Sequence, residues 1–470
     1  MDKRPRIDGK ERLIRNGRSK EDQHARRLCL EALEAALAAI DPTSNVRTRL
    51  RLSRGRLRVD GFSIAMPTRI RVLAVGKASA RMLSGALKVL GEHVVSGILV
   101  APKAETVRNL NGRIIAFHTG HPSPDWEGVK ASRYVMKSVE SMDSDELLLC
   151  LISGGASAML PAPAAGITLA DKRMITQRLI RSKASIHEVN TVRRHLSELK
   201  GGQLAEKCPA GQIISLIISD VPGNTLSDIG SGLTAPDPTT FQDAINVLRE
   251  FGLWGSAPLN VKRHLNEGLF GHISETPKQG APAFRKVHNF IIAENNTACA
   301  AARDALKRRG VHTTILTSSV NTEARTLGKL LASVAGDSEV FGRTLKRPAA
   351  LVIGGETTVE VKGAGRGGRN QELPLAAMDG IAGSDGTAIA TLGTDGIDGN
   401  SPAAGAIVDG ESLHRASRLR LSGREFMARN DSYTFFRKLG DNVTTGATGT
   451  NVGDVCILMR VKRDSIIYQL

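Results

Sequence analysis

The stretch RIRVLAVGKAS, residues 69–79, decides the fold class. Its first seven residues form a mainly apolar run that leads into Gly76 and Lys77, and a helical pattern follows as far as Leu90. An apolar run that ends in a glycine turn and a helix is typical of a strand covered on both faces in a parallel sheet. Such sheets bind ligands at the carboxyl ends of their strands. The stretch therefore predicts an α/β fold and makes Lys77 a candidate to bind an anion.

The same order of apolar strand, glycine-rich turn and helix recurs along most of the chain. Because strands alternate with helices, we expect a parallel sheet with helices on both faces. A second α/β block is expected from about residue 289 onward. The predicted strands are GILVA (97–101), RIIAFHTG (113–120), ELLLCLIS (146–153) and IISLIISD (213–220) in the first block, and HNFIIAENNTA (288–298), VHTTILT (311–317), AALVIGGE (349–356), TTVEV (357–361), AIATLGTDG (388–396) and VCILMRV (455–461) in the second.

The composition indicates a globular protein of two or three domains. The chain has 470 residues, of which 41% are hydrophobic and only 3% aromatic. Its formal net charge of +17 would suit nucleic-acid binding, but the stacking aromatics that such proteins use are nearly absent. An enzyme with anionic ligands explains the charge better, so we expect no nucleic acid as a partner. No apolar stretch approaches the roughly 20 residues of a membrane-spanning helix, so we expect no membrane either.

Several segments are predicted from local composition. Residues 1–24 are basic and nearly free of apolar side chains, which favours a disordered tail. Residues 49–59 alternate Arg with Leu around a Ser–Gly turn, which predicts a strand pair with one solvated basic face. Residues 266–288 are polar and rich in Gly and Pro, which favours an exposed loop between the domains. The five scattered cysteines include no CxxC motif, so we expect reduced thiols and a cytoplasmic location.

Two motifs in the first block follow predicted strands directly. SGGASAML (153–160) places Ser153, Gly154 and Gly155 where backbone N–H groups can cradle an anion at the start of a helix. A tight turn without a ligand is the alternative. Asp220 ends the apolar run before VPGN, a position that suits a catalytic base or a metal ligand. The alternative for this aspartate is turn capping.

A third motif, HEVNTVRRHLSELKGGQLA (187–205), is predicted to form a helix. Asn190 and Arg194 are four residues apart and therefore share one face of that helix. Both are candidates to bind the substrate or a nucleotide, and a solvated basic helix is the alternative. The histidines show no HExxH or other metal spacing, so zinc catalysis is not expected.

The region 353–409 combines three glycine-rich segments, IGGETTVEV, KGAGRGGRNQE and LGTDGIDGN. Arginine offers a planar, permanently charged fork that matches phosphate or carboxylate. Two aspartates in a glycine-rich turn can hold a hard cation such as Mg²⁺. Together these features indicate phosphoryl transfer to a small acidic substrate. The candidates are Arg366 for catalysis, Glu356, Arg369 and Asn370 for binding, and Asp395 and Asp398 for the metal.

The segment GAGRGG (363–368) also matches the G-x-G-x-x-G pattern of dinucleotide-binding folds. That pattern is informative when it opens the first βαβ unit of a domain. Here it comes late in the chain, after a predicted hairpin, and its loop carries two arginines. An oxidoreductase therefore stays open as a second interpretation.

Taken together and in order, these motifs resemble the class II glycerate kinases, the glycerate 2-kinase family with a DUF4147-type N-terminal domain and a C-terminal MOFRL domain. The resemblance covers about residues 25–460 and is carried by VGKAS, TGHPSPD, LISGGASAML, HEVNTVRRHLSELKGGQLA, SDVPGN, GSGLTAPDPTT, GGETTVEVKGAGRGGRNQE and GTDGIDGNSPAAGA. It implies a Rossmann-like domain over residues 25–265 and a connection over 266–288. It also implies a smaller mixed α/β domain over 289–470, with the MOFRL region at about 349–457 and the active site in the cleft between the domains.

The resemblance also implies an activity. Members of the family phosphorylate D-glycerate at its 2-hydroxyl with ATP and Mg²⁺, giving 2-phosphoglycerate. On the matching motifs, the implied catalytic residues are Lys77, Asp220 and Arg366, with Arg369 close by. Some relatives carry the name hydroxypyruvate reductase, so an NAD(P)H-dependent reductase is the alternative. The oligomeric state stays open, with a homodimer as one option.

Overall fold

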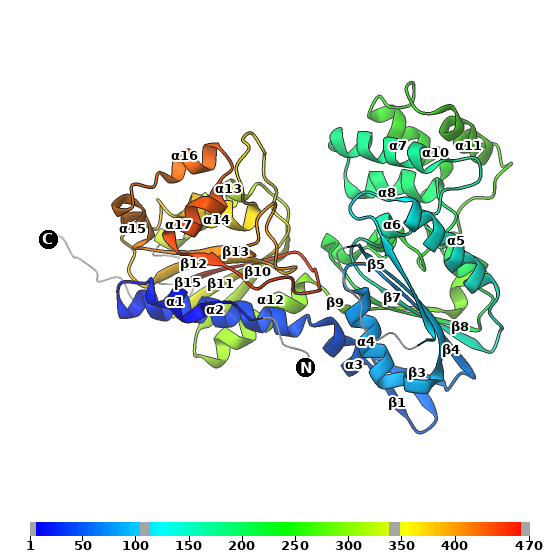
Figure 1. Cartoon of the computed structure of the whole chain (residues 1–470), viewed down its shortest axis with the longest axis horizontal. Coiled ribbons are helices and arrows are strands. Elements are labelled where there is room, and N and C mark those ends of the chain that lie inside the picture. The colour runs from blue at the N-terminus through cyan, green and yellow to red at the C-terminus, as the bar shows by residue number, and fades with distance from the viewer. Residues whose placement is uncertain (1–5, 104–111, 338–347, 462–470) are drawn as a thin grey trace. The chain divides into compact units, whose positions relative to one another are not determined.

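The computed structural model describes residues 6–103, 112–337 and 348–461. The chain divides into two compact units. We name residues 42–293 the central unit, and residues 1–41 together with 294–470 the terminal unit. Each unit contains a six-stranded sheet with helices around it, which confirms the predicted α/β class (Figure 1).

The central unit is built on a parallel sheet with the strand order β6-β5-β4-β7-β8-β9. Every neighbouring pair in this sheet is parallel. All seven residues of β7 are buried, as expected for a strand that helices cover on both faces. The strands are β4 (Arg69–Val75), β5 (Val94–Pro102), β6 (Ile114–Thr119), β7 (Glu146–Ile152), β8 (Gln212–Ile218) and β9 (Val287–Ala293).

Two clusters of buried side chains stabilise the central unit. In one, α5 (Trp126–Glu140) packs Val135 and Val139 against strand residues such as Leu73 and Val100. The other joins α7 (Leu169–Arg181), α8 (Ile186–His195), α10 (Phe241–Glu250) and α11 (Leu259–Leu269), which lie together in Figure 1. The remaining helical elements are α3 (Pro42–Arg49), α4 (Ser79–Leu90), η1 (Gly91–His93), α6 (Ala156–Met159), α9 (Gln203–Lys207), η2 (Pro222–Asn224), η3 (Ile229–Ser231) and η4 (Pro282–Lys286).

The Arg/Leu alternation at the start of the central unit forms a small antiparallel sheet. Its strands are β1 (Leu50–Ser53), β2 (Arg56–Val59) and β3 (Phe62–Ala65). Leu50 and Leu57 are buried, whereas Arg51 and Arg58 are exposed. The predicted strand pair with one solvated basic face is therefore confirmed, and a third strand extends it.

The structure places the end of the first block later in the chain than predicted. β9 pairs in parallel with β8, so the segment expected to open the second block completes the first sheet instead. Residues 266–288, predicted as an exposed connection, contain the end of α11, the turn η4 and the start of β9. The unit boundary falls between Ala293 and Glu294. The strand itself was predicted, and only its sheet differs, because a local pattern does not specify which strand will be its partner.

The terminal unit contains a mixed sheet with the strand order β10-β11-β15-β12-β13-β14. β10 and β11 are parallel, and β15 is antiparallel to both β11 and β12. The predicted strand at 357–361 does not form, and Thr358 makes only an isolated bridge to Glu323. The place beside β11 that a hairpin would need is taken by β15. The strands are β10 (His312–Val320), β11 (Ala349–Gly355), β12 (Thr387–Gly393), β13 (Gly405–Asp409), β14 (Asn442–Val443) and β15 (Asp454–Arg460).

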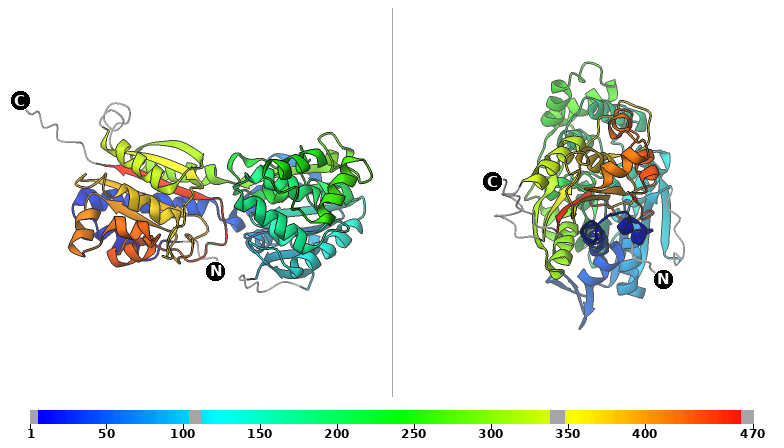
Figure 2. Two further views of the ribbon diagram at one scale, coloured as in Figure 1. Left: turned by 90° about the horizontal axis from the view of Figure 1, so that it is seen from above. Right: turned by 90° about the vertical axis from the view of Figure 1, so that its left-hand side faces the viewer.

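Helices cover both faces of the terminal sheet (Figures 1 and 2). On one face α2 (Lys20–Ala39) packs against α12 (Asn295–Arg308), and α2 also contacts β12 and β15. On the other face α13 (Ala324–Gly336) and α14 (Arg369–Ala377) share a core with the side chains of β11 and β15. The remaining helices are α1 (Lys10–Arg15), α15 (Ser412–Arg418), α16 (Gly423–Ala428) and α17 (Ser432–Leu439).

The N-terminal segment is a structured part of the terminal unit. Residues 1–24 were predicted to be a disordered tail, yet α1 and the start of α2 lie within them. Leu13 and Ile14 are buried, and the fully buried Arg26 forms ion pairs with Asp409 and Asp441. Within the predicted tail itself, Asp22 is buried and accepts from the N–H of Gly386 at 2.9 Å.

Candidate active site

The centre of the parallel sheet is a point where the chain reverses its direction of travel across the sheet. The chain runs from β4 outward to β5 and β6, then returns to place β7 on the other side of β4. The carboxyl ends of two strands that diverge in this way leave a crevice in which open α/β sheets bind ligands. Gly76 and Lys77 follow β4 directly, and Ser153 to Gly155 follow β7. The fold thus brings two of the predicted motifs together.

Backbone contacts connect the two motifs. The N–H of Lys77 donates to the carbonyl of Gly154 at 2.9 Å, and the N–H of Ser153 donates to the carbonyl of Val75 at 3.0 Å. The hydroxyl of Ser153 accepts from the N–H of Ala78 at 3.0 Å. Ser153 is buried, so its side chain fixes the turn that carries Lys77. Direct contact of Ser153 with a ligand stays a prediction, and the bond to Ala78 shows that its hydroxyl positions the turn.

Asp220 joins this cluster from the end of β8, two positions beyond Ile218. A side chain at Gly154 would place its Cβ 2.0 Å from Oδ2 of Asp220, so this carboxylate lies directly against the glycine backbone. Only a residue without a side chain fits at this position. Asp220 itself is half-buried. The predicted anion cradle and the predicted catalytic carboxylate are therefore neighbours at the same edge of the sheet.

His121 is a member of the cluster that the motif analysis did not select. Its ring packs against Gly155, and Cδ2 would lie 2.8 Å from a Cβ at that glycine. Burial and the positive charge of Lys77 lower the pKa of His121 to about 4. Its imidazole is therefore neutral at pH 7. The signal available in the sequence was the motif TGHPSPD, but a single histidine carries no spacing that indicates its partner.

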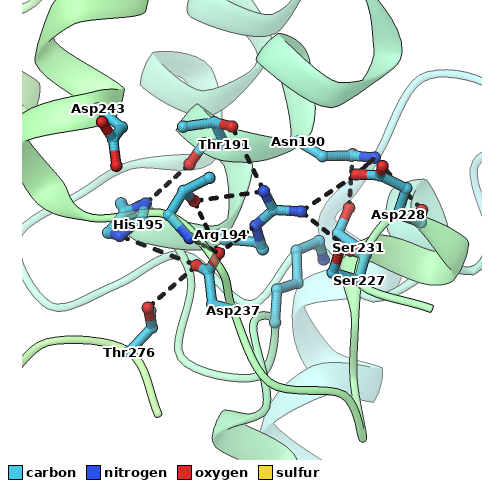
Figure 3. A network of polar contacts seen from close by, with 12 residues as sticks. Asn190, Thr191, Arg194, His195, Ser227, Asp228, Ser231, Asp237, Asp243 and Thr276 are labelled. Carbon is cyan, nitrogen blue, oxygen red and sulfur yellow. Dashed lines mark hydrogen bonds and ion pairs between the residues drawn. The ribbon is translucent and has the colours of Figure 1, made fainter. Parts of the chain in front are cut away.

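Asn190 and Arg194 share one face of α8, as predicted, but that face is buried (Figure 3). Arg194 contacts Asp228 at 3.2 Å and Asp237 at 2.9 Å. The amide of Asn190 donates to Oδ1 of Asp228 at 3.2 Å, and its oxygen accepts from the hydroxyl of Ser231 at 2.8 Å. Arg194 is thus paired with two carboxylates inside the protein, and its predicted role in ligand binding stays a prediction.

This buried network reaches the glycine-rich turn. The hydroxyl of Ser231 also lies 2.7 Å from the hydroxyl of Ser157 in α6, directly after the SGGA segment. Asn190 is therefore connected to the turn through Ser231, and Arg194 joins the same network through Asp228. Neither aspartate partner was predictable from spacing, because Asp228 and Asp237 lie more than thirty residues beyond Arg194.

A second cluster occupies the terminal unit, around the start of α14. Arg369 forms a two-point ion pair with Asp454, Nε to Oδ2 at 2.6 Å and Nη2 to Oδ1 at 3.1 Å. A third bond joins Nη1 to Oε1 of Glu356 at 2.7 Å. Asn370 donates its side-chain amide to Oδ1 of Asp454 at 2.8 Å. Asp454, which was not among the predicted residues, thus joins Arg369 and Asn370, and Arg369 in turn holds Glu356.

The two aspartates predicted to bind a metal have different surroundings. Asp398 is buried and accepts at both oxygens, from the N–H of Asn370 at 3.0 Å and from Nε2 of Gln371 at 2.8 Å. Burial raises the pKa of Asp398 to about 7. Asp395 is half-buried at the end of β12 and accepts from the N–H of Ile397 at 3.1 Å. Within the described ranges, no three acidic, histidine or cysteine side chains gather as a ready-made metal site.

Arg366 lies in the glycine-rich loop that precedes α14. It is exposed, and its guanidinium stacks 4.9 Å from the ring centre of Tyr433. Its backbone N–H donates to Oδ1 of Asp431 at 3.0 Å. A Cβ at Gly365 would lie 2.5 Å from the carbonyl oxygen of Arg429, so this loop glycine permits close packing on the chain before α17. Because the loop is anchored in this way, its arginine side chain is presented to solvent in a defined orientation.

The glycine-rich loop does not have the setting of a dinucleotide site. It follows β11, whose neighbours are the parallel β10 and the antiparallel β15, and the chain enters α14 before reaching β12. In a dinucleotide-binding fold, this pattern opens a βαβ unit, in which the helix connects two strands of a parallel sheet. Here β11 and β12 are separated by an antiparallel strand.

Comparison with known proteins gives the family. A sequence profile described as "Domain of unknown function (DUF4147)" matches residues 28–266, and the MOFRL family profile matches residues 349–454. A Thermotoga maritima protein named D-glycerate 2-kinase is 36% identical over 432 residues, covering 92% of this chain and 97% of that protein. A glycerate 2-kinase of Pyrococcus horikoshii is 36% identical over 433 residues, covering 92% and 96%. An Agrobacterium vitis protein that carries a provisional name, hydroxypyruvate reductase, is 36% identical over 451 residues, covering 95% and 96%.

Solved structures agree with these sequence matches. The crystal structure of a glycerate kinase from Thermotoga maritima superposes with a TM-score of 0.81 at 35% identity, covering 93% of this chain and 99% of that chain. The crystal structure of a Pyrococcus horikoshii protein gives the same TM-score of 0.81, identity and coverage. The chain therefore belongs to the family of α/β proteins that joins a DUF4147 domain to a MOFRL domain and that includes the glycerate kinases.

Proposed function

We propose that this protein is a glycerate 2-kinase, which transfers a phosphoryl group from ATP to the 2-hydroxyl of D-glycerate and releases 2-phosphoglycerate and ADP. The observation that carries the proposal is the match to named glycerate 2-kinases over nine-tenths of the chain. The cluster of Lys77, His121, Gly154 and Asp220 supports it, because it combines a cation, a carboxylate and backbone N–H groups at the ligand-binding edge of a parallel sheet.

We infer a role for each member of the central cluster. Asp220 accepts the proton of the glycerate hydroxyl as that oxygen attacks the phosphoryl group. Lys77 neutralises negative charge that spreads over the transferred group in the transition state. The N–H groups of Gly154 and Gly155 bind an oxygen of the phosphoryl group or of the substrate carboxylate. His121, neutral at pH 7, offers a ring nitrogen for a hydrogen bond without adding charge.

The terminal unit is proposed to act on the phosphoryl donor. The exposed guanidinium of Arg366 is suited to a phosphate of ATP, because its fork is charged at every relevant pH. Arg369 and Asn370 hold the start of α14 in place through Asp454, and Glu356 adds a bond to Arg369. When bound with ATP, Mg²⁺ neutralises phosphate oxygens and orients them for in-line transfer.

The residues present fit a magnesium ion at one of the two predicted positions. Mg²⁺ in such enzymes keeps several waters and binds one or two carboxylates together with substrate phosphates. The half-buried Asp395 suits this arrangement. Asp398 suits it less, because both of its oxygens already accept hydrogen bonds from α14.

The reductase alternative has less support. It rests on the provisional name of relatives such as the Agrobacterium vitis protein and on the pattern GAGRGG. The loop that contains this pattern packs against the segment before α17, and its two flanking strands are separated by an antiparallel strand. We therefore retain the kinase as the proposed reaction.

The test is a coupled assay of ADP formation with ATP, Mg²⁺ and D-glycerate, with the product identified by NMR. The expected result is glycerate-dependent ADP formation with 2-phosphoglycerate as product. Formation of 3-phosphoglycerate would overturn the proposed regiochemistry. Oxidation of NADH or NADPH with hydroxypyruvate, in the absence of any ADP formation, would replace the kinase with the reductase.

Compartment and assembly stay predictions. The five cysteines are buried and unpaired with one another, which supports a reducing, cytoplasmic environment. Among the described residues, no helix has both the length and the apolar composition that crossing a membrane requires. A homodimer is a further prediction, which size-exclusion chromatography with light scattering would test.

A further inference from the structure

A pocket of about 190 Å³ lies in the central unit beside the proposed catalytic cluster. Its walls come from α7, from the end of α8, from α6 and from residues 122–124. Two of these segments also serve the cluster, since Pro122 follows His121 and Ser157 follows the SGGA turn. The pocket is nevertheless lined by a separate set of side chains, none of which has a role in the proposed reaction.

Basic side chains make up most of the ionisable lining of this pocket. Lys172, Arg173, Arg193 and Lys200 all line it, together with hydroxyl groups such as those of Ser157 and Thr176. In the described part of the chain, no aspartate or glutamate lines the pocket. A cavity with several cations and no carboxylate has the composition of an anion site.

The contrast between two adjacent arginines of α8 supports this interpretation. Arg194 points into the network of Figure 3, where Asp228 and Asp237 neutralise it. Arg193 lines the pocket, and burial is the single cause that lowers its pKa, to about 10. Arg193 is half-buried, and a cation withdrawn from water without a counter-charge is costly, so structural cations are normally paired as Arg194 is. The charge of Arg193 is therefore available to a ligand.

The two lysines of the pocket are held in position but are not neutralised. Lys172 donates to the carbonyls of Pro161 at 2.7 Å and Leu196 at 2.8 Å, and Lys200 donates to the carbonyl of Leu160. Burial and the charge of Arg193 lower the pKa of Lys200 to about 7. Burial, with Lys200 and Arg193, lowers the pKa of Lys172 well below its usual value.

Other ionisable groups near these lysines do not remove the excess of positive charge. Glu198 favours the charged form of Lys172, but its effect is the smallest of those that act on this lysine. His264 lies close enough for its pKa to be lowered by the charge of Lys172, and it adds no negative charge. An anion in the pocket would favour the protonated form of both lysines.

We propose that this pocket binds a small anion that carries a phosphate group. A phosphate ester brings close to two negative charges and three acceptor oxygens at neutral pH, which suits the group of Lys172, Arg193 and Lys200 better than the single charge of a carboxylate does. A volume of about 190 Å³ is below the 300–1,000 Å³ typical of sites for drug-sized ligands, so a whole nucleoside triphosphate does not fit. The class is therefore inorganic phosphate or the phosphate ester of a small molecule, whichever reaction the enzyme catalyses.

The test is isothermal titration calorimetry of the full-length protein with inorganic phosphate at pH 8. At this pH Lys200 is mostly neutral in the free protein, because its pKa is about 7. An anion that raises this pKa makes the lysine take up a proton. We expect saturable phosphate binding whose heat depends on the ionisation enthalpy of the buffer, which is the signature of proton uptake. A site formed by exposed cations would bind phosphate without this signature.

Variants locate the site. We expect Arg193→Gln to weaken phosphate binding by roughly 10-fold to 100-fold, the effect of losing a charged hydrogen bond. Arg181→Gln, a change of an exposed arginine on α7 outside the pocket, serves as the control and leaves the Kd unchanged. Lys200→Met provides a second variant if Arg193→Gln does not fold, and it abolishes the proton uptake that Lys200 contributes.

Titrations with D-glycerate and 2-phosphoglycerate define the class of ligand. For the binding that Arg193→Gln weakens, which is the binding at this pocket, we expect tight, proton-linked association of 2-phosphoglycerate and phosphate and weak association of D-glycerate. Binding of D-glycerate at this pocket without binding of phosphate would overturn the proposed class. Phosphate binding that is unaffected by both Arg193→Gln and Lys200→Met would place the anion elsewhere. These outcomes concern binding alone and do not depend on which reaction is catalysed.

Discussion

Lys77 is the residue whose charge the proposed reaction needs most. We expect Lys77→Met to lower kcat by roughly 100-fold to 1,000-fold, the usual cost of removing one electrostatic contact to a transition state. The measurement is steady-state ADP formation at saturating glycerate and ATP. Lys130→Met is the matched control, because Lys130 is an exposed residue of α5 paired with Glu127. A Lys77→Met enzyme with near-normal kcat would remove this lysine from the mechanism.

The same variant tests the contact between Lys77 and His121. Both burial and the charge of Lys77 disfavour the protonated ring, and together they lower the pKa of His121 to about 4. Lys77→Met removes one of these causes, so we expect the pKa of His121 to rise in the variant. NMR titration of the histidine ring signals measures this shift, with His121→Gln used to identify the signal. An unchanged pKa in Lys77→Met would mean that the two side chains are not close.

The lowered pKa of His121 also predicts how the stability of the protein changes with pH. The pKa of His121 is lower in the folded protein than its ordinary value of 6.5, so the unfolded chain binds more protons between about pH 4 and 6.5. The contribution of His121 to stability is therefore complete above pH 6.5 and is lost as the pH falls toward 4. Lys77→Met should lose less stability than the wild type over this interval.

Gly154 belongs to the predicted anion cradle and lies directly against the carboxylate of Asp220. Because a Cβ at this position would lie 2.0 Å from Oδ2 of Asp220, we expect Gly154→Ala to displace that carboxylate and to reduce kcat roughly 100-fold or more. Circular dichroism and the thermal midpoint should show a folded protein. Gly255→Ala is the control, since nothing lies within 4 Å of a Cβ at Gly255. Full activity in Gly154→Ala would contradict the close approach.

For individual residues, the sequence predicted where a side chain lies in the fold better than what that side chain does. Lys77 and Asp220 follow apolar strands directly, and the end of a parallel strand is where ligands bind, so their placement was predictable. The burial of Ser153 and Arg194 was not, because it depends on partners that are distant in sequence. Asp454 was missed for the same reason, since its importance lies in a contact with Arg369 across 85 residues.

The helix α2 is joined to the rest of the terminal unit by the buried charge of Arg26. Arg26 is fully buried between Asp409 and Asp441, so its removal leaves carboxylates inside the protein with less compensation. We expect Arg26→Met to lower the free energy of unfolding of the terminal unit by roughly 3–5 kcal/mol. The neighbouring Arg27→Met is the control, because Arg27 is largely exposed and its loss should cost about 1 kcal/mol or less. Urea denaturation followed by circular dichroism distinguishes these values, and equal midpoints would show that Arg26 is not required.

The elements that were predicted correctly are those with a strong pattern of their own. The buried strands β4, β7, β8 and β15 are near-continuous apolar runs that lie between turn signals. The predicted strand at 357–361 has strand-forming residues but no free neighbour to pair with, because β15 lies beside β11. The edge strand β9 was assigned to the wrong sheet because local pattern does not specify which strand will be its partner.

The whole molecule is organised differently from a simple succession of two domains. Residues 1–41 pack with residues 294–470, so the terminal unit is formed from both ends of the chain. The DUF4147 profile, which begins at residue 28, therefore includes part of α2 although this helix packs in the other unit. A boundary inferred from the order of motifs cannot reveal this arrangement, because it depends on contacts between the two ends of the chain.

This organisation predicts how the protein divides into fragments. Residues 42–293 contain the complete parallel sheet with its helices, so we expect this fragment to fold alone and to unfold cooperatively. Residues 294–461 lack α2, which leaves apolar surface of β12 and β15 uncovered and removes Arg26, the ion-pair partner of Asp409 and one of two arginine partners of Asp441. We expect this second fragment to aggregate or to remain unfolded.

A fusion of the two ends of the chain provides the decisive comparison. Joining residues 6–41 to 294–461 through a flexible Gly/Ser linker restores α2 and Arg26, and we expect a cooperatively folded protein. The same fusion carrying Arg26→Met should have a lower midpoint in urea, since the ion pairs lie wholly within this unit. If residues 294–461 alone unfold with the same midpoint as the fusion, then α2 is not an integral part of the terminal unit. If only the fusion folds, both ends of the chain must be synthesised before the terminal unit can form.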